Sequence, residues 1–285
     1  MNEENYLNNW IDTVLTEDIH EGDHSTLSCV PKDALDAAIL LVKEPGVLSG
    51  VEIAKKVFHR FDPELKIEVF IQDGSRVNTG DRAFEVSGSA QSILTTERTV
   101  LNIMQRLSGV ATKTSQLSDM IAHTNCKLLD TRKTTPGMRT MEKQAVLHGG
   151  AVNHRHGLYD MIMLKDNHID YAGGIGLAME RTRSYLNANN LDLRIEIEAR
   201  DRQEVIETMT GDIPDRIMLD NFNLEDLKWA IEYVDGRAET EASGGITEKT
   251  IVPIAETGVD FISVGALTHS VKSLDLSLKA KASLA

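Results

Sequence analysis

The second half of the chain opens with the segment KLLDTRK at residues 127–133, and a similar apolar run, MIMLK, follows at residues 161–165. Further short runs occur between segments of helical spacing, at residues 194–198, 216–220, 240–243 and 261–265. Alternation of strand-like and helix-like segments is typical of βαβ units and a parallel sheet. A closed α/β barrel needs about eight strands, more than these runs supply. We therefore predict an open, incomplete parallel α/β barrel over residues 114–270.

The first 113 residues mix helical and strand-like patterns without this regular alternation. Helical spacing covers residues 5–16, 51–61 and 91–107, and strand-like runs lie at residues 37–42, 65–71 and 83–86. These patterns predict a separate N-terminal domain of mixed α/β structure over residues 1–113. A last helical pattern near residues 273–281 has no strand after it. We expect residues 271–285 to form a C-terminal helix that packs back on the N-terminal domain.

The composition is that of an ordinary globular chain, with 41% hydrophobic and 26% charged residues. No stretch of about 18 apolar residues occurs, so no membrane span is predicted. The acidic start lacks the apolar core of a signal peptide, and two cysteines are too few for a disulfide framework. We expect a cytoplasmic protein in which Cys29 and Cys126 are buried as small hydrophobic residues.

A cationic segment contrasts with the formal net charge of −14. From Arg132 to Lys165 there are six Lys or Arg residues and two acidic residues, Glu142 and Asp160. Clustered guanidinium and ammonium groups in an acidic chain indicate binding of a small polyanion with carboxylate or phosphate groups. A nucleic-acid surface is not expected, because polymer binding needs broadly distributed positive charge.

Charged side chains recur at the carboxyl ends of the predicted barrel strands, which line one common mouth in α/β barrels. The acidic members, Glu198 and Asp220, end the third and fourth strands. Facing them, we predict a cationic half formed by Arg132, Lys133, His154, Arg155 and Lys165. Any one of these charges would usually belong to a solvated loop. The same register in four successive units favours a binding site.

Glycine-bearing segments follow the last two predicted strands, as Ser243-Gly244-Gly245 and Val264-Gly265-Ala266. Glycine lets backbone N–H groups approach a phosphate, and the last two units are the usual phosphate position in such barrels. Each segment alone could be ordinary turn chemistry. Together they favour a phosphate site.

Other polar residues carry less weight. His168 can cap the helix that follows Lys165 as readily as it can contact a ligand. His148 and His156 can be structural. Arg98 lies on the flank of the apolar face of the 91–107 helix, where a solvated arginine is common.

Several motifs together resemble quinolinate phosphoribosyltransferase, also called carboxylating nicotinate-nucleotide pyrophosphorylase. The resemblance begins near Glu17-Asp18 and reaches Ser270, so it covers essentially the whole chain. The motifs that carry it are Glu97-Arg98-Thr99, Asp130-Thr131-Arg132-Lys133-Thr134, His154-Arg155, Leu164-Lys165-Asp166-Asn167-His168, Leu219-Asp220-Asn221-Phe222, Ser243-Gly244-Gly245 and Val264-Gly265-Ala266-Leu267-Thr268-His269-Ser270. No departure from the family pattern occurs at these positions.

The resemblance implies a mixed α/β sandwich domain followed by an open α/β barrel. It also implies transfer of a phosphoribosyl group from phosphoribosyl pyrophosphate to quinolinate, with Mg²⁺ as cofactor. The products would be nicotinate mononucleotide, pyrophosphate and carbon dioxide, a step of NAD biosynthesis.

The resemblance also assigns roles to residues. The implied quinolinate site comprises Arg98, Arg132, Lys133, His154, Arg155 and Lys165. The implied catalytic residues are Glu198, Asp220, Lys133 and Lys165. Phosphoribosyl pyrophosphate is implied to contact Lys133, Lys165, Glu198, Asp220, Ser243, Gly244, Gly245, Val264, Gly265 and Ala266. Mg²⁺ is expected to bind mainly through substrate, with Glu198 and Asp220 as candidate ligands. Arg98 matches an arginine supplied by a neighbouring subunit, so we expect a homodimer or a higher oligomer.

Two alternatives stay open. A homologous pyrophosphorylase could use another acceptor, although the set of Arg98, Arg132, Arg155 and Lys165 favours a dicarboxylate over a monocarboxylate. A non-catalytic sensor of a phosphorylated carboxylate would bind anions better without Glu198 and Asp220. An assay for release of carbon dioxide and pyrophosphate from quinolinate would distinguish the quinolinate enzyme from both alternatives.

Overall fold

The computed structural model describes residues 3–281. Its internal contacts divide this part of the chain into two compact units. The first unit comprises residues 3–115, Thr135–Gly150 and 271–281, and the second comprises Gln116–Thr134 and Ala151–Ser270.

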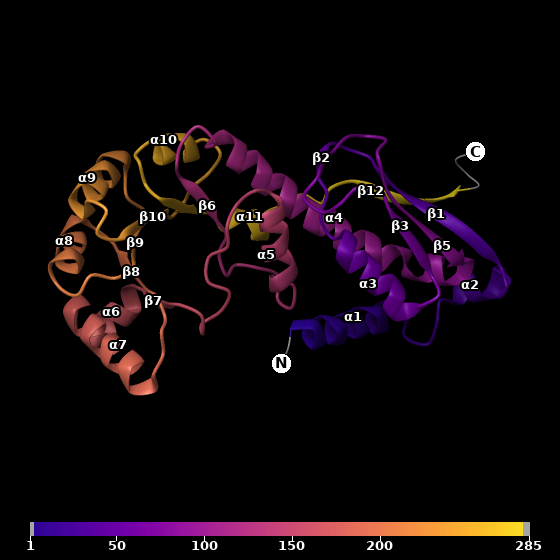
Figure 1. The fold of residues 1–285 in the computed structure, drawn as a ribbon, viewed down its shortest axis with the longest axis horizontal. Coiled ribbons are helices and arrows are strands. Elements are labelled where there is room, and N and C mark those ends of the chain that lie inside the picture. Colours follow the sequence, from indigo (N-terminus) through magenta and orange to yellow (C-terminus); the bar gives the residue numbers. More distant parts are fainter. Residues whose placement is uncertain (1–2, 282–285) are drawn as a thin grey trace. The chain divides into compact units, whose positions relative to one another are not determined.

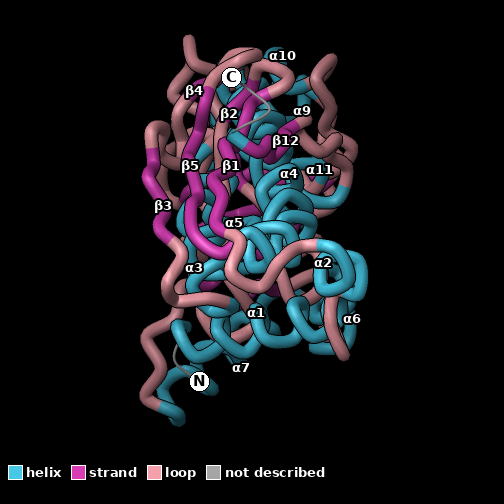
Figure 2. The backbone as a smooth tube through the Cα atoms, turned by 90° about the vertical axis from the view of Figure 1, so that its right-hand side faces the viewer, coloured by secondary structure: helices cyan, strands magenta, loops and turns pink. Residues whose placement is uncertain are grey.

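The first unit contains a four-stranded antiparallel sheet with the order β12-β1-β5-β3. Figure 2 shows β1, β5 and β3 running alongside one another. The strands of the sheet are β12 (Leu276–Ala280), β1 (Leu35–Val42), β5 (Arg82–Ser89) and β3 (Lys66–Val69), and a separate pair joins β2 (Gly46–Val47) to β4 (Arg76–Val77). The helices are α1 (Glu3–Ile19), α2 (His24–Cys29), α3 (Val51–Phe61), α4 (Ala90–Met120) and α5 (Arg139–His148).

The α3 helix illustrates how this unit is held together. Its buried residues Val51, Ala54, Val57 and Phe58 recur at a spacing that places them on one face of the helix. The Phe58 ring meets Phe84 of β5 edge to face, with ring centroids 6.1 Å apart. Burial of large aromatic side chains in this geometry fastens the helix to the sheet. The predicted mixed α/β character of the N-terminal domain is confirmed.

The prediction of a C-terminal helix is wrong. Residues Leu276–Ala280 form β12, which pairs antiparallel with β1 in the first unit, with Leu278 opposite Leu40. Leu276 and Leu278 are buried, and Ser277 between them is less so. Alternating burial is typical of a half-buried strand. Over so few residues, the hydrophobic pattern of such a strand cannot be distinguished from that of a helix. Residues 282–285 of the expected helix lie outside the described part of the chain.

The second unit is a parallel sheet of six strands in the order β6-β11-β10-β9-β8-β7. Figure 1 shows the helices from α6 to α10 on the outer side of this curved row of strands. The strands are β6 (Lys127–Leu129), β7 (Ile162–Leu164), β8 (Ile195–Ala199), β9 (Arg216–Asp220), β10 (Glu239–Ser243) and β11 (Phe261–Ser263). The helices are α6 (Asp166–Ala172), α7 (Ile175–Asn189), α8 (Arg202–Thr210), α9 (Leu224–Val234), α10 (Ile251–Ala255) and α11 (Ala266–His269).

The two ends of this row, β6 and β7, do not pair with one another among the described residues. The predicted open barrel is therefore confirmed. Each strand leads at its carboxyl end into a loop and a helix, and side-chain caps fix two of these helices. Asp201 accepts a hydrogen bond from the Glu204 amide at the start of α8, and Asn223 accepts one from the Asp226 amide at the start of α9.

The α5 segment differs from the predicted division of the chain. Residues Thr135–Gly150 were expected within the barrel domain, but they group with the first unit. Glu142 is fully buried there and accepts hydrogen bonds from Arg106 Nε at 3.0 Å and Nη2 at 2.9 Å. A buried carboxylate needs such compensation, and Arg106 of α4 supplies it. This ion pair anchors α5 to α4.

Two smaller expectations concerned the burial of the cysteines and the absence of a membrane span. Cys126 is buried, and burial raises its pKa to about 12, but Cys29 is exposed, contrary to the prediction. Within residues 3–281, every helix is too short or too polar to cross a bilayer.

Candidate active site

A cavity of about 860 Å³ opens at the carboxyl ends of the barrel strands, within the second unit. All the residues predicted for the barrel mouth line it: Arg132, Lys133, His154, Arg155, Lys165, Glu198, Asp220, Ser243, Gly244, Gly245, Val264, Gly265 and Ala266. Strand ends of a parallel sheet meet at one edge, which explains how residues distant in sequence converge. Arg98 lies elsewhere, exposed on α4 in the first unit.

Two arginines form the core of the cationic side. Arg132 follows β6, and Arg155 lies in the loop before β7, where its Nη1 donates a hydrogen bond to the Met161 carbonyl at 3.2 Å. Burial lowers the pKa of Arg155, and the positive charge of Arg132 lowers it further. Two guanidinium groups that repel each other in a half-buried wall would be stabilised by an anion placed between them.

Lys165 and Glu198 link the cationic side to the acidic side. Lys165 Nζ lies 3.2 Å from Glu198 Oε2, and the Glu198 side chain is only 11% exposed. The backbone of Lys165 is held by α6, since its N–H donates to His168 Nδ1 at 2.9 Å. His168 is thus a capping residue, which was one of the two roles considered for it, the other being contact with a ligand.

Asp220, at the end of β9, is the second acid of the cavity. Its Oδ2 accepts a hydrogen bond from the side-chain amide of Asn221 at 2.7 Å. Asn221 has a left-handed backbone, with φ of 57°, and its side chain packs directly against Gly244. A side chain at position 244 would overlap Asn221, so glycine is required there. Asn221 belongs to one of the motifs that carry the resemblance, but no role was predicted for it.

The glycine loops complete the cavity. Gly244 and Gly245 follow β10 with φ of 95° and 58°, and the space beside Gly245 is open. Gly265 follows β11 and faces Lys133, whose carbonyl accepts a hydrogen bond from Thr268 Oγ1 at 2.9 Å. Open space next to glycine backbone is the feature that admits a phosphate group.

A buried cluster lies below this mouth. His154 Nε2 is 3.0 Å from Glu196 Oε2 and 3.3 Å from Glu241 Oε2, and Arg216 Nη1 donates to Glu241 Oε2 at 3.0 Å. Glu196 and Glu241 are fully buried. Although burial disfavours a charged ring, the two nearby carboxylates outweigh that effect and raise the pKa of His154 to about 9. Burial, and then the charge of Glu241, raise the pKa of Glu196.

Sequence analysis missed Glu196, Glu241 and Arg216. A signal was present, because the β8 segment reads Ile-Glu-Ile-Glu-Ala and the β10 segment reads Glu-Thr-Glu-Ala-Ser. Acids at alternate positions of a central barrel strand point to one face, and that face is the barrel interior. A buried acid of this kind requires a partner.

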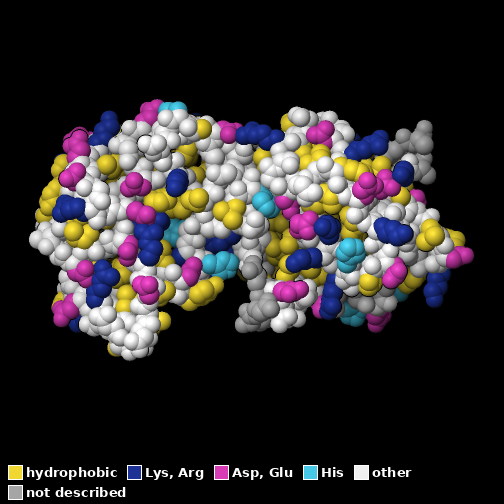
Figure 3. Space-filling model, viewed as in Figure 1, with side chains coloured by type: hydrophobic (Ala, Val, Ile, Leu, Met, Phe, Trp, Pro, Cys, Tyr) yellow, Lys and Arg dark blue, Asp and Glu magenta, His cyan; other side chains and the backbone are white. Residues whose placement is uncertain are grey.

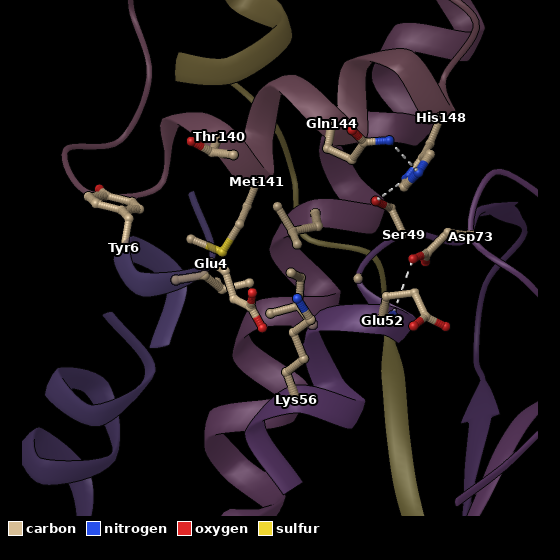
Figure 4. A pocket seen from close by; sticks show the side chains of 14 residues that line it. Glu4, Tyr6, Ser49, Glu52, Lys56, Asp73, Thr140, Met141, Gln144 and His148 are labelled. Atoms are coloured by element: carbon tan, nitrogen blue, oxygen red, sulfur yellow. Dashed lines mark hydrogen bonds between the residues drawn. The ribbon is translucent and has the colours of Figure 1, made fainter. Parts of the chain in front are cut away.

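Two other histidines considered from the sequence, His148 and His156, have structural contacts. His148 belongs to a second cavity, of about 560 Å³, which lies within the first unit (Figure 4). There the ring bonds to Ser49 Oγ at 2.8 Å through Nδ1 and to Gln144 Nε2 at 3.2 Å through Nε2. His156 donates its backbone N–H to Asp160 Oδ2 at 2.6 Å in a loop of the second unit. Neither ring lines the barrel cavity.

Comparison with known proteins identifies the family of this chain. The family model "Quinolinate phosphoribosyl transferase, N-terminal domain" matches residues 23–108, and "Quinolinate phosphoribosyl transferase, C-terminal domain" matches residues 110–279. The mitochondrial quinolinate phosphoribosyltransferase (decarboxylating) 2b of Nicotiana tabacum is 45% identical, over 93% of this chain and 79% of its own.

Bacterial relatives are similar over nearly their full length. The probable nicotinate-nucleotide pyrophosphorylase (carboxylating) of Bacillus subtilis is 39% identical, over 92% of this chain and 89% of its own. The solved nicotinate-nucleotide pyrophosphorylase from Francisella tularensis has a TM-score of 0.93 at 38% identity, over 99% of this chain and 98% of that one. The chain belongs to the quinolinate phosphoribosyl transferase family.

Proposed function

We propose that the protein transfers the phosphoribosyl group of phosphoribosyl pyrophosphate to quinolinate and releases pyrophosphate and carbon dioxide, forming nicotinate mononucleotide. One observation carries this proposal. A single cavity brings a cationic wall, with Arg132 and Arg155, together with the acids Glu198 and Asp220 and the glycine loops after β10 and β11. The family relationship supplies the identity of the two substrates.

The cationic wall suits a dicarboxylate. Each guanidinium can bind one carboxylate through two parallel hydrogen bonds, and Lys133 and Lys165 add point charges nearby. A ligand with two adjacent carboxylates would relieve the repulsion between Arg132 and Arg155 that lowers the pKa of Arg155. A monocarboxylate could engage only one of the two guanidinium groups, which favours quinolinate over nicotinate as acceptor.

The acidic wall suits the sugar. When pyrophosphate leaves, positive charge develops on the ribose, and Glu198 and Asp220 are held where they can stabilise it. The ring nitrogen of the acceptor then bonds to the anomeric carbon. The positive nitrogen draws electron density from the ring, so the neighbouring carboxylate departs as carbon dioxide and its electron pair stays on the ring carbon. A proton from solvent then adds to that ring carbon.

The donor set also fits Mg²⁺. Glu198 already pairs with the Lys165 ammonium group, whereas Asp220 accepts a hydrogen bond from the neutral Asn221 amide, so Asp220 is the better carboxylate ligand. Mg²⁺ prefers oxygen ligands and commonly keeps few protein ligands beside substrate phosphates. We propose that it binds chiefly through pyrophosphate and ribose oxygens and neutralises the leaving group.

The glycine loops suit the 5′-phosphate. Gly245 leaves open space beside the backbone of the loop after β10, and Ser243 adds a hydroxyl donor. Gly265 and Ala266 present the backbone of the loop after β11 to the same cavity. We propose that these segments hold the phosphate on the side of the cavity away from the acceptor.

We further propose a homodimer or higher oligomer in which Arg98 reaches the quinolinate site of a partner. Arg98 is exposed on α4 and does not line the cavity formed by the second unit of its own chain. A two-fold dimer can bring such a residue to the other subunit. The free thiols of Cys29 and Cys126 favour a reducing, cytoplasmic location.

The decisive assay supplies quinolinate labelled with ¹³C in the carboxylate at ring position 2, together with phosphoribosyl pyrophosphate and Mg²⁺. We expect labelled carbon dioxide and pyrophosphate in equal amounts, and no turnover of nicotinate. Turnover of nicotinate without quinolinate turnover would assign the protein to another acceptor. Binding of both ligands without turnover would instead make it a sensor.

A further inference from the structure

Asn221 lines the barrel cavity directly after Asp220, the last residue of β9. Its backbone N–H donates a hydrogen bond to the Ser243 carbonyl at 2.8 Å, which ties the start of the loop after β9 to the end of the neighbouring strand β10. Its φ of 57° is left-handed, a conformation that asparagine adopts more readily than most other residues. The backbone of two neighbouring strands therefore sets the position of Asn221.

The glycine at position 244 makes room for the Asn221 side chain. A Cβ atom at position 244 would lie 2.5 Å from Asn221 Cγ and 2.9 Å from Asn221 N, and closer still to Asn221 Oδ1. Such distances are shorter than atoms in contact can approach, so only glycine leaves the asparagine in place. The side chain is held with Oδ1 toward Gly244 and Nδ2 toward Asp220.

The side-chain amide meets the carboxylate of Asp220. Asn221 Nδ2 donates a hydrogen bond to Asp220 Oδ2 at 2.7 Å. A carboxylate accepts hydrogen bonds and the nitrogen is the donor of an amide, so this orientation of the asparagine is the one that the chemistry requires. The carboxylate torsion of aspartate is broad, and a hydrogen bond to one oxygen fixes where the other points. With Oδ2 held, Oδ1 is the oxygen left for a ligand.

A cation could in principle orient Asp220 in place of the amide. On the face of the second unit that Figure 3 shows, acidic side chains lie among basic ones. Among the described residues, however, Asp220 forms no ion pair, whereas Lys165 Nζ lies 3.2 Å from Glu198 Oε2. The two acids of the cavity are thus held differently, Glu198 by an ammonium group and Asp220 by a neutral amide.

We propose that Asn221 is a positioning residue for Asp220. Its amide holds the Asp220 carboxylate so that Oδ1 is presented to the sugar, and its own position is fixed by Ser243 and Gly244 of the glycine loop. The acid is thereby placed in register with the phosphate site. This inference rests on the proposed function, which places the ribose of the phosphoribosyl donor at Asp220. Asn221 acts through Asp220 and needs no contact with the reacting atoms.

Three variants isolate the amide. Asn221→Gly removes it and leaves a residue that adopts the left-handed backbone without strain. Asn221→Asp keeps the shape of the side chain but places a carboxylate where the donor was, and it serves as a second variant if the glycine variant does not fold. Asn223→Gly is the matched control, because Asn223 lies two residues further along the same loop, caps α9 and does not line the cavity. Glycine is itself an acceptable N-cap.

A double-mutant cycle tests whether Asn221 acts through Asp220. With both substrates saturating, Asn221→Gly should lower turnover about tenfold, the effect expected of one hydrogen bond to a charged group. Its affinity for quinolinate in calorimetry should stay within about twofold, because the amide does not face the cationic wall. In an Asp220→Asn background the same substitution should change turnover by less than about threefold, since the carboxylate that it orients is gone. Asn223→Gly should match wild type.

A binding measurement repeats the cycle without turnover. Ribose 5-phosphate carries the sugar and the phosphate but no pyrophosphate, so it can be titrated without Mg²⁺ and followed by ³¹P NMR. Its affinity should fall about tenfold in Asn221→Gly, and adding Asn221→Gly to Asp220→Asn should weaken it by less than about threefold. Inorganic phosphate lacks the sugar, and it should bind wild type and Asn221→Gly with affinities within about twofold of one another.

Several results would overturn the inference. Wild-type turnover in folded Asn221→Gly and Asn221→Asp proteins would do so. Equal losses from Asn221→Gly in the wild-type and Asp220→Asn backgrounds would show that the asparagine acts independently of Asp220. Weakened binding of inorganic phosphate would assign Asn221 to the glycine loop instead. A wild type that binds ribose 5-phosphate but does not turn over quinolinate would refute the proposed function, and the ribose 5-phosphate cycle would still decide the role of Asn221.

Discussion

Replacing Arg155 with Ala should remove most of the affinity for quinolinate. The side chain is half-buried, its Nη1 is fixed on the Met161 carbonyl at 3.2 Å, and Arg132 lies near enough to lower its pKa. Truncating one partner of a buried, hydrogen-bonded charge pair costs about 2–5 kcal/mol. At about 1.4 kcal/mol per tenfold, quinolinate binding should weaken by between about thirtyfold and several thousandfold. The upper half of that range is expected, because the bound carboxylate would lose a partner inside a desolvated wall.

Titration calorimetry with quinolinate and with phosphoribosyl pyrophosphate measures the effect directly. The affinity for phosphoribosyl pyrophosphate should change by less than about threefold, because Arg155 belongs to the cationic wall and the proposed phosphate site is formed by the glycine loops. Arg183→Ala is the matched control, because Arg183 is in the same unit but pairs with Asp212 at 2.7 Å outside the cavity. Arg155→Lys should give an intermediate loss, as it keeps charge but not the planar fork. Unchanged quinolinate affinity in Arg155→Ala would refute the assignment of the cationic wall.

The other predictions concern catalysis, assembly, pH and thiol reactivity. Glu198→Gln should lower turnover by roughly 10²–10³ with a much smaller change in quinolinate affinity, and a variant with a raised Michaelis constant at normal turnover would contradict the role. Arg98→Ala and Arg155→Ala proteins should each be inactive, whereas co-refolded mixed dimers should regain activity at one intact site; mixed dimers that stay inactive would exclude a contribution from the partner. His154 has its pKa raised to about 9 from 6.5, so its stabilising contribution is complete below pH 6.5 and is lost as the pH rises through 9. The gap in unfolding free energy between wild type and His154→Gln should narrow over that interval in urea titrations, and a gap that widens would contradict the assignment. Cys126, with a pKa of about 12, should resist iodoacetamide in the folded protein until denaturant is added, as mass spectrometry would show.

Short apolar runs at regular intervals were sufficient to predict the second unit. Runs such as 161–165 and 216–220 are too short for helices and are separated by helical patterns, so a parallel sheet with outer helices was the consistent solution. The count of runs also predicted that the barrel is open. Because active groups in such barrels lie at strand ends, the register of Lys165, Glu198 and Asp220 was sufficient to predict where the mouth lies.

The C-terminal strand, and the assignment of α5 to the first unit, could not be predicted from local sequence patterns. Residues 276–280 form a strand only because the edge of β1 is available to pair with them, and a short segment carries too little periodicity to reveal that partner. The α5 helix groups with the first unit because its buried Glu142 requires Arg106, a partner 36 residues away in the chain. Both choices depend on contacts between distant segments.

By itself, the sequence determined the alternation of strands and helices in the second unit, its open parallel barrel and the residues that face its mouth, because these follow from local periodicity and from the geometry of parallel strands. Only the tertiary structure decided which charges meet. It placed Lys165 against Glu198, and it joined His154 to Glu196 and Glu241 beneath the mouth. Such pairings depend on strand order and register across the sheet, which bring side chains that are distant in sequence within reach of one another.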